Sequence, residues 1–190
     1  MSDRRPKLSA PRLVRDLATL DQALYEAVTV TKTPTLDTAL RRLSATADHS
    51  KISFAVAAGL ALRGGSPRRA AVLGVAAIGV ASATANLLGK RLVRRPRPHR
   101  AEDSPFPGRH VPMPESASFP SGHTASAVAF AAAVGPALPV AAVPLGLLAC
   151  AVGYSRVHTG VHYPGDVIAG ALLGTGAAAL VLGAAARAGV

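Results

Sequence analysis

The sequence contains few of the residue types on which soluble domains depend. Its 190 residues include no Trp, three Tyr, four Phe and one Cys, and only 16% of them are charged. A soluble surface needs about 25% charged residues, so an ordinary soluble domain is disfavoured. The single cysteine excludes a disulfide scaffold, and we expect Cys150 to be buried because it lies in the apolar run LGLLACAVG. A disordered chain is excluded as well, since 49% of the residues are hydrophobic.

Acidic residues are also scarce, so the net charge is strongly positive. Lys and Arg total 21 against 10 Asp and Glu, which gives a formal net charge of +11. Such an excess favours an anionic partner: nucleic acid, a membrane surface or phosphate. The most basic segment, KRLVRRPRP, contains no aromatic residue on which a base could stack, and we therefore expect no nucleic-acid partner.

Long runs without charge occupy much of the chain. They are Ala70–Gly89, Ser121–Ser155 with His123 as its one interruption, and Val167–Ala186. About 20 apolar residues in a helix match the ~30 Å hydrocarbon core of a bilayer. The middle run is long enough for two spans joined near Gly135-Pro136. Gly, Ala and Ser dominate these runs, as in closely packed membrane helices. The sequence therefore predicts an all-α, polytopic membrane bundle.

The residues before these runs have a different pattern. Apolar side chains recur at helical spacing from Leu13 to Val28 and again from Leu36 to Ala47, with charged and polar residues between them. This pattern predicts two amphipathic helices that lie on the membrane or pack against the bundle. An ordinary helical hairpin of the soluble type is the alternative. The first twenty residues contain no apolar stretch, so no signal peptide is expected.

A shorter apolar run, Ile52–Leu62, would bring the number of membrane spans to about five. We therefore divide the chain into an interfacial segment, residues 1–50, and a membrane-embedded domain, residues 51–190. No oligomeric state is predicted.

Polar residues cluster at three places along the membrane domain. These are Lys90–Pro98, Pro120–His123 and Ser155–Asp166. The first follows a predicted span, the second begins the next span, and the third joins the last two. Because successive spans alternate in direction, all three segments fall on the same membrane face.

The positive residues of these segments suit a phosphate group. Lys90, Arg97 and Arg156 carry fixed charge and N–H donors that match phosphate oxygens. Ser121 and Gly122 begin a helix, where unpaired backbone N–H groups and the helix dipole favour an anion. The segments thus predict a phosphate site.

The histidines supply reactive groups. His162 and Asp166 are four residues apart, so Asp166 can accept a hydrogen bond from the ring and leave the other nitrogen free to attack phosphorus. His123 can give a proton to the departing alkoxide. Together with the positive residues, these groups predict phosphoryl transfer.

Each feature also has a structural explanation. A basic cluster after a membrane helix often marks topology, and Asp166 and Ser121 can be simple helix caps. We favour a site because independent explanations would not place all three segments on one face at these spacings. The other histidines are interpreted as structural: His49, His99, His110 and His158.

The three segments resemble the signature of the type-2 phosphatidic acid phosphatase family. That signature is Lys, six residues, Arg-Pro; then Pro-Ser-Gly-His; then Ser-Arg, five residues, His, three residues, Asp. In this chain it reads KRLVRRPRP from Lys90, PSGH from Pro120, and SRVHTGVHYPGD from Ser155. The match is complete at every signature position and covers the chain from about Leu62 onward.

The resemblance implies a role for each matching residue. His162 would be the nucleophile that forms a phosphohistidine, Asp166 would orient it, and His123 would protonate the leaving group and then activate water. The phosphate would be held by Lys90, Arg97, Ser121, Gly122 and Arg156. The family works without a metal or other cofactor. Many of its membrane members have six helices, so the amphipathic N-terminal segment is expected to replace a missing one.

The predicted spans favour a lipid substrate within this family over the haloperoxidase activity of its larger soluble members. Arg outnumbers Lys by 17 to 4, which resembles the composition of high-GC bacteria such as actinomycetes. Small members there resemble phosphatases of polyprenyl phosphates, including decaprenylphosphoryl-phosphoribose of cell-wall arabinan synthesis. Phosphatidylglycerophosphate, phosphatidic acid and undecaprenyl pyrophosphate are alternative substrates. A non-enzymatic alternative is a basic membrane module that binds anionic lipid, which would not need the two histidines and the acid at these spacings.

The basic residues also predict orientation in a bacterial plasma membrane. If Ile52–Leu62 spans, the site face carries 17 Lys and Arg and the opposite face 4, which predicts a cytoplasmic active site. If that run does not span, the N-terminal segment moves to the far face. The far face would then hold 13 basic residues and the site face 8, which reverses the prediction.

Overall fold

The computed structural model describes residues 10–100 and 106–189, and every regular element in these stretches is helical. The elements are α1 (Ala10–Val30), α2 (Pro34–Thr46), η1 (Asp48–Ser50), α3 (Lys51–Ala61), α4 (Gly65–Ala83), the π-helical η2 (Thr84–Gly89), α5 (Lys90–Leu92), η3 (Pro107–Arg109), α6 (Gly122–Ala137), α7 (Pro139–His158) and α8 (Pro164–Arg187). The all-α prediction is confirmed.

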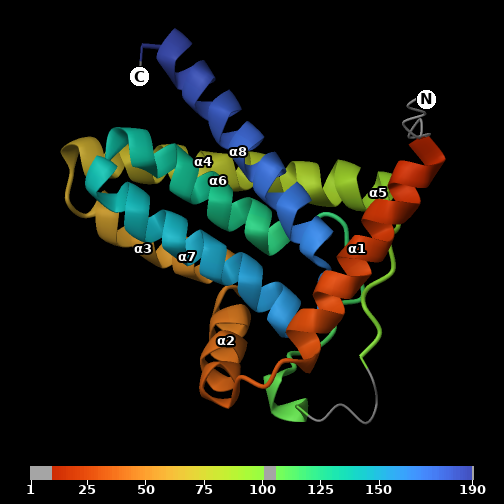
Figure 1. Cartoon of the computed structure of the whole chain (residues 1–190). Helices are drawn as coiled ribbons and strands as arrows, with labels where there is room; N and C mark the ends of the chain where they lie inside the picture. Colours follow the sequence, from red (N-terminus) through yellow and green to blue (C-terminus); the bar gives the residue numbers. More distant parts are fainter. Residues whose placement is uncertain (1–9, 101–105, 190) are drawn as a thin grey trace, which may run out of the picture.

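Helix α6 lies at the centre of the bundle and packs against α4, α7 and α8 (Figure 1). Small side chains make this possible, because Ala125, Ala129 and Ala133 fill the contacts and are fully buried. On α8, a Cβ atom at Gly170 or Gly174 would collide with backbone carbonyl oxygens at the start of α6. The Gly- and Ala-rich composition therefore brings helix backbones close together, and it fixes how α6 begins relative to α8.

Three helical stretches are long and apolar enough to cross a membrane. They are Gly65–Leu92, Pro139–His158 and Pro164–Arg187. The prediction of a polytopic membrane bundle is thereby confirmed. The two other expected spans form shorter helices, α3 with 11 residues and α6 with 16. At about 1.5 Å per residue, α3 is only about 16 Å long, roughly half of the hydrocarbon thickness. For α3 and α6, spanning stays a prediction.

The predicted amphipathic helices are present as α1 and α2. Both lie at the end of the bundle where α7 finishes and α8 starts (Figure 1). The apolar side chains of α1, among them Leu13, Leu17 and Leu20, are exposed, whereas Tyr25 is buried against the bundle. An exposed apolar face suits a helix at the membrane interface better than a hairpin of the soluble type. The division at residue 50 stays a prediction.

Arg109 links the end of α1 to α2. Its buried guanidinium donates to the carbonyl oxygens of Thr29 and Thr31 at 3.1 and 3.0 Å. It also forms an ion pair of 3.0 Å with Asp37 of α2. One side chain thus satisfies the carbonyl groups that the end of α1 leaves unpaired.

The expectation that Cys150 is buried is wrong, because this thiol is exposed on α7. Only one face of α7 meets the bundle, and it carries Ala149, Val152 and Gly153. Successive helical residues are about 100° apart, so the residue after Ala149 points away from that face. An apolar run in a membrane helix shows that a segment avoids water, and it does not show which side contacts protein.

Candidate active site

The three polar segments meet at one end of the bundle. The backbone N–H of Ser121 donates to the carbonyl oxygen of Asp166 at 2.9 Å, which joins the start of α6 to the start of α8. Arg97, in the segment after α5, donates to the carbonyl oxygen of Val161 at 2.7 Å. These bonds connect residues far apart in the sequence and form a single polar site.

His162 and Asp166 face each other in the buried part of this site. The Nδ1 atom of His162 lies 3.5 Å from Oδ2 of Asp166, and the histidine is only 2% exposed. The same carboxylate oxygen accepts a hydrogen bond of 3.0 Å from the backbone N–H of Tyr163, the N-cap of α8. Asp166 is therefore a helix cap and the partner of His162 at once.

The surroundings of His162 favour its neutral form. Burial, the largest cause, lowers the pKa of His162 to about 4, and the positive charges of Arg97 and Arg156 act in the same direction. Asp166 opposes this shift but does not cancel it. The ring is therefore neutral at pH 7, as a nucleophile requires. The Nη1 atom of Arg97 is 3.3 Å from Nε2, the ring nitrogen on the side away from Asp166.

Lys90 and Arg97 are held together by Ser116. Lys90 Nζ donates to the Ser116 hydroxyl at 3.1 Å, and the Nε of Arg97 donates to the Ser116 carbonyl oxygen at 2.8 Å. Ser116 was not among the predicted site residues. Its contacts hold two of the three predicted phosphate-binding cations, of which Arg97 lies beside His162.

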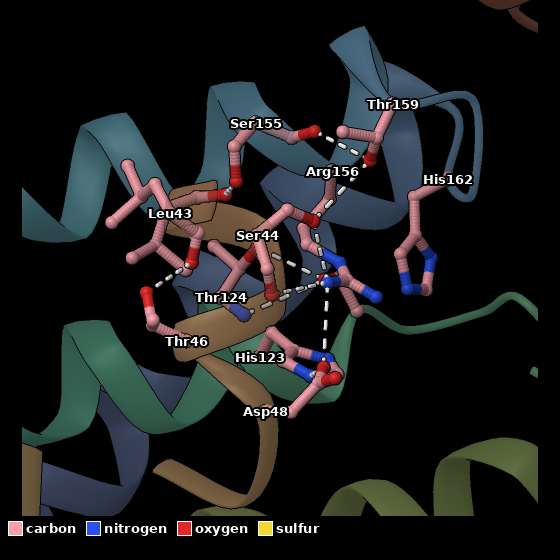
Figure 2. A network of polar contacts seen from close by, with 12 residues as sticks. Leu43, Ser44, Thr46, Asp48, His123, Thr124, Ser155, Arg156, Thr159 and His162 are labelled. Atoms are coloured by element: carbon pink, nitrogen blue, oxygen red, sulfur yellow. Dashed lines mark hydrogen bonds and ion pairs between the residues drawn. The ribbon is translucent and has the colours of Figure 1, made fainter. Parts of the chain in front are cut away.

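Arg156, the third cation, is 2% exposed and is anchored by the N-terminal segment (Figure 2). Its Nη1 atom donates to the hydroxyl and the carbonyl oxygen of Ser44 in α2, at 2.7 and 3.0 Å. Its Nε atom has no hydrogen-bond partner among the described residues. A buried guanidinium with an unused donor retains capacity for an anion.

Ser121 and Gly122 sit at the start of α6, as expected. The Ser121 hydroxyl is the N-cap and accepts from the backbone N–H and the hydroxyl of Thr124, at 3.4 and 3.0 Å. The structural explanation thus applies to the Ser121 side chain. At Gly122 no atom lies within 4 Å of the position of a Cβ, so this turn faces open space.

His123 contacts a residue that sequence reasoning missed. Its Nε2 atom lies 2.7 Å from Oδ1 of Asp48, in the turn η1 that joins α2 to α3 (Figure 2). The same Asp48 oxygen lies 3.6 Å from Nη1 of Arg156. The one sequence signal was an acid four residues before the apolar run that begins at Ile52, which by itself predicts no contact.

Arg95 was missed as well. It lies between two carboxylates, 3.0 Å from Oδ1 of Asp166 and 2.7 Å from Oδ2 of Asp21 in α1. Its guanidinium also stacks over the Tyr163 ring, with 4.0 Å to the ring centroid. Arg95 therefore supports Asp166 from the side opposite His162 and ties α1 to the site.

His158 has a partner outside the site. It is buried and its Nε2 atom lies 3.0 Å from Oδ1 of Asp37, which agrees with its structural interpretation. His49 is exposed in the turn η1. The structure thus separates these two histidines from His123 and His162.

The structure combines a helical membrane bundle with a buried histidine–carboxylate pair among cations. This combination is typical of a class of phosphoryl-transfer proteins, and the comparison with known families agrees. A family profile described as the PAP2 superfamily matches residues 70–189. The chain belongs to this superfamily, which confirms the resemblance.

Individual relatives are phosphatases by name. The chain is 43% identical over 121 residues to the decaprenylphosphoryl-5-phosphoribose phosphatase of Mycobacterium tuberculosis, covering 60% of this chain and 62% of that protein. The match thus spans about three fifths of the relative's length. The lipid A 1-phosphatase of Rhizobium johnstonii is 42% identical over 98 residues, which is 47% of this chain and 37% of that protein.

A solved structure supports the fold. The transmembrane PAP2-type phosphatidylglycerolphosphate phosphatase of Bacillus subtilis superposes with a TM-score of 0.71 at 24% identity. The superposition covers 90% of this chain and 87% of that chain. This protein and the relative share the bundle as a whole, including the part before the family match.

Proposed function

We propose that the protein is a membrane lipid-phosphate phosphatase that works through a phosphohistidine intermediate. The observation that carries the proposal is the buried pair of His162 and Asp166, with Arg97 beside the far nitrogen of the ring. A neutral imidazole among fixed cations is suited to attack a phosphate, because the cations neutralise the charge of the transferring group.

The reaction would proceed in two steps at this site. The Nε2 atom of His162 attacks phosphorus while His123 gives a proton to the leaving oxygen, so that the free alcohol departs. His123 then takes a proton from water, the water oxygen attacks the phosphohistidine, and phosphate leaves. Arg97 and Arg156 hold the phosphoryl oxygens through both steps.

A lipid substrate fits the surroundings of His123. An apolar cavity between α3, α6 and α7 is lined by Val56, Phe130 and Leu145, and His123 also lines it. The cavity has a volume of about 20 Å³, which is too small for a lipid chain, so the chain itself would lie outside it. Its apolar lining beside His123 nevertheless favours a leaving alcohol of lipid type over a small polar one.

Among lipid phosphates we favour decaprenylphosphoryl-5-phosphoribose, with a role in cell-wall synthesis. The support is the 43% identity to the mycobacterial phosphatase of that name. The rhizobial relative is named a lipid A 1-phosphatase, so a glycolipid phosphate is an alternative substrate. The other candidate substrates are phosphatidylglycerophosphate, phosphatidic acid and undecaprenyl pyrophosphate.

The N-terminal contacts bear on the proposed orientation. Ser44 and Asp48 reach Arg156 and His123, so the N-terminal helices lie at the end of the bundle that holds the site. Their basic residues therefore count with the site face whether or not α3 spans. The predicted excess of 17 basic residues over 4 supports an active site at the cytoplasmic face of a bacterial plasma membrane.

The test is phosphate release from a panel of lipid phosphates in detergent, with EDTA present. We expect release by the wild type, with decaprenylphosphoryl-5-phosphoribose preferred, and a loss of at least about 1,000-fold in His162→Asn, in line with the removal of a nucleophile. His99→Asn is the matched control, because His99 is exposed. Equal release by the wild type and His162→Asn would refute the histidine mechanism, and loss of release in EDTA would indicate a metal.

A further inference from the structure

Asp48 occupies an unusual position for a residue of the N-terminal segment. It belongs to a three-residue turn in which the next two residues, His49 and Ser50, have φ angles of 55° and 58°. Left-handed backbone is unfavourable for residues other than Gly, at a cost of order 1 kcal/mol each, and persists where surrounding contacts fix it. The turn brings the Asp48 carboxylate to 2.7 Å from Nε2 of His123 (Figure 2).

Most of the surroundings of His123 disfavour its protonated form. Burial is the largest cause, Arg156 and His162 act in the same direction, and the carboxylate of Asp48 opposes them. The ring also stands at the start of α6, where the positive end of the helix dipole disfavours a cation. The neighbouring acids are engaged with other groups. Asp166 contacts His162 and Arg95. Within the described part of the chain, Asp48 is the carboxylate that contacts His123.

We propose that Asp48 is a positioning residue for the reaction, whose carboxylate orients His123 and favours the protonated form that delivers a proton to the leaving oxygen. The inference rests on the proposed phosphatase function. The site then contains two histidine–carboxylate pairs with opposite tasks. Asp166 orients a neutral nucleophile, and Asp48, from outside the three signature segments, supports an acid.

The proton transfer balances with these groups. As the His162 Nε2–phosphorus bond forms, the bond from phosphorus to the bridging oxygen breaks, and its electron pair stays on that oxygen. The oxygen takes the proton from the His123 ring nitrogen that does not face Asp48. In the second step His123 regains a proton from the attacking water, and the phosphorus–nitrogen bond breaks with its electron pair returning to His162.

A leaving-group comparison tests the assignment. An alkoxide needs a proton to depart, whereas p-nitrophenolate departs readily without one. We expect Asp48→Asn to lower kcat about 10- to 100-fold on dioleoyl phosphatidic acid, a part of the 10²–10⁴-fold typical of general acids. On p-nitrophenyl phosphate the same variant should lose less than about threefold in the burst of p-nitrophenolate, which reports the first step alone. Asp48→Glu should restore most of the activity on the lipid.

The matched control is Asp16→Asn, which removes the same charge from the exposed surface of α1 and should leave both substrates unaffected. In a His123→Asn background, Asp48→Asn should cause no further loss on dioleoyl phosphatidic acid, because a positioning residue acts only through its partner. This double-variant comparison uses the full chain in detergent.

Several results would overturn the inference. Equal losses on both substrates would mean that Asp48 only maintains the fold, and an unchanged kcat would mean that it has no role. A lower KM with higher activity would mean that Asp48 competes with the phosphate for Arg156. Each of these leaves the proposed function intact as long as His162→Asn is inactive on p-nitrophenyl phosphate. If His162→Asn is active, the phosphatase mechanism itself fails.

Discussion

At the scale of single residues, the proposed site rests on two histidines that have different carboxylate partners. His162 is buried, lies beside two arginines and is held against Asp166, so it stays neutral. His123 is less buried and contacts Asp48. The two rings have the same chemistry, and the carboxylate that each one contacts distinguishes the proposed nucleophile from the proposed acid.

The titration of His162 gives a direct prediction at this scale. The pKa of this histidine is about 4, because burial penalises the charged ring and the neighbouring arginines repel it. Its ring should therefore stay neutral as the pH falls through about 6.5, where an ordinary histidine protonates, and titrate only near pH 4. ¹⁵N NMR of labelled histidine in detergent micelles, with the resonance assigned by its loss in His162→Asn, measures this.

The same shift links protonation to stability. Since the unfolded chain binds this proton at a higher pH than the folded protein does, the free energy of unfolding should fall as the pH drops from about 6.5 towards 4. A titration midpoint near 6.5 would contradict the burial of the ring and its proximity to Arg97 and Arg156.

At the scale of helices, the site depends on how closely α6 and α8 approach. Ser121 before α6 and Asp166 in α8 share a backbone hydrogen bond of 2.9 Å, so any separation of the helices would move His123 away from His162. Gly170 and Gly174 permit that approach. Gly170 and Gly174 are thus part of the positioning of the site.

Gly174→Ala should separate these helices. A Cβ at residue 174 would meet the carbonyl oxygen of Ala125 and, at 3.0 Å, the backbone nitrogen of Ala129, neither of which can move without the helix. We expect a loss of about 1–3 kcal/mol in the free energy of unfolding, as in other overpacked interiors. The measurement is thermal unfolding in detergent, together with kcat.

The control for this experiment is two residues away on the same helix. Gly176→Ala places its Cβ in open space and should be neutral or stabilising by up to about 1 kcal/mol, through helix propensity alone. If both variants behaved alike, the close contact between α6 and α8 would not be what holds the site.

At the scale of the whole molecule, the segment predicted as a separate interfacial region completes the site. Asp21, Ser44 and Asp48 each contact a residue of the three signature segments. The polar end of the bundle is thus closed by α1, α2 and η1. This arrangement also places the basic residues of α1 and α2 at the end of the bundle that holds the site.

Orientation in the membrane can be measured on the intact cell. In a Cys150→Ala background, Ser66→Cys at the start of α4 should react with a membrane-impermeant maleimide, because it lies at the end opposite the site. Thr31→Cys, between α1 and α2, should react only after the cells are opened. Both positions are exposed. The reverse pattern would place the active site outside the cell.

The sequence by itself determined the class of the fold and the signature residues of the site. Uncharged runs of about 20 residues have one stable solution in a bilayer, a helix with its backbone groups paired internally. The alternation of such helices then brings three polar segments to one face, whatever their packing. His162, Asp166 and Arg97 could be named in advance because their spacing is local or belongs to a recognisable signature.

Only the tertiary structure decided which neighbours those residues have. Asp48 is 75 residues from His123, and Arg95 is 71 from Asp166. Periodicity indicates which face of a helix is apolar, but it does not say what that face meets, so Cys150 was assigned to the interior and proved exposed. Contacts of this kind depend on the angles and distances between whole helices. Those follow from packing of small side chains such as Gly174 against a partner, which a single sequence does not name.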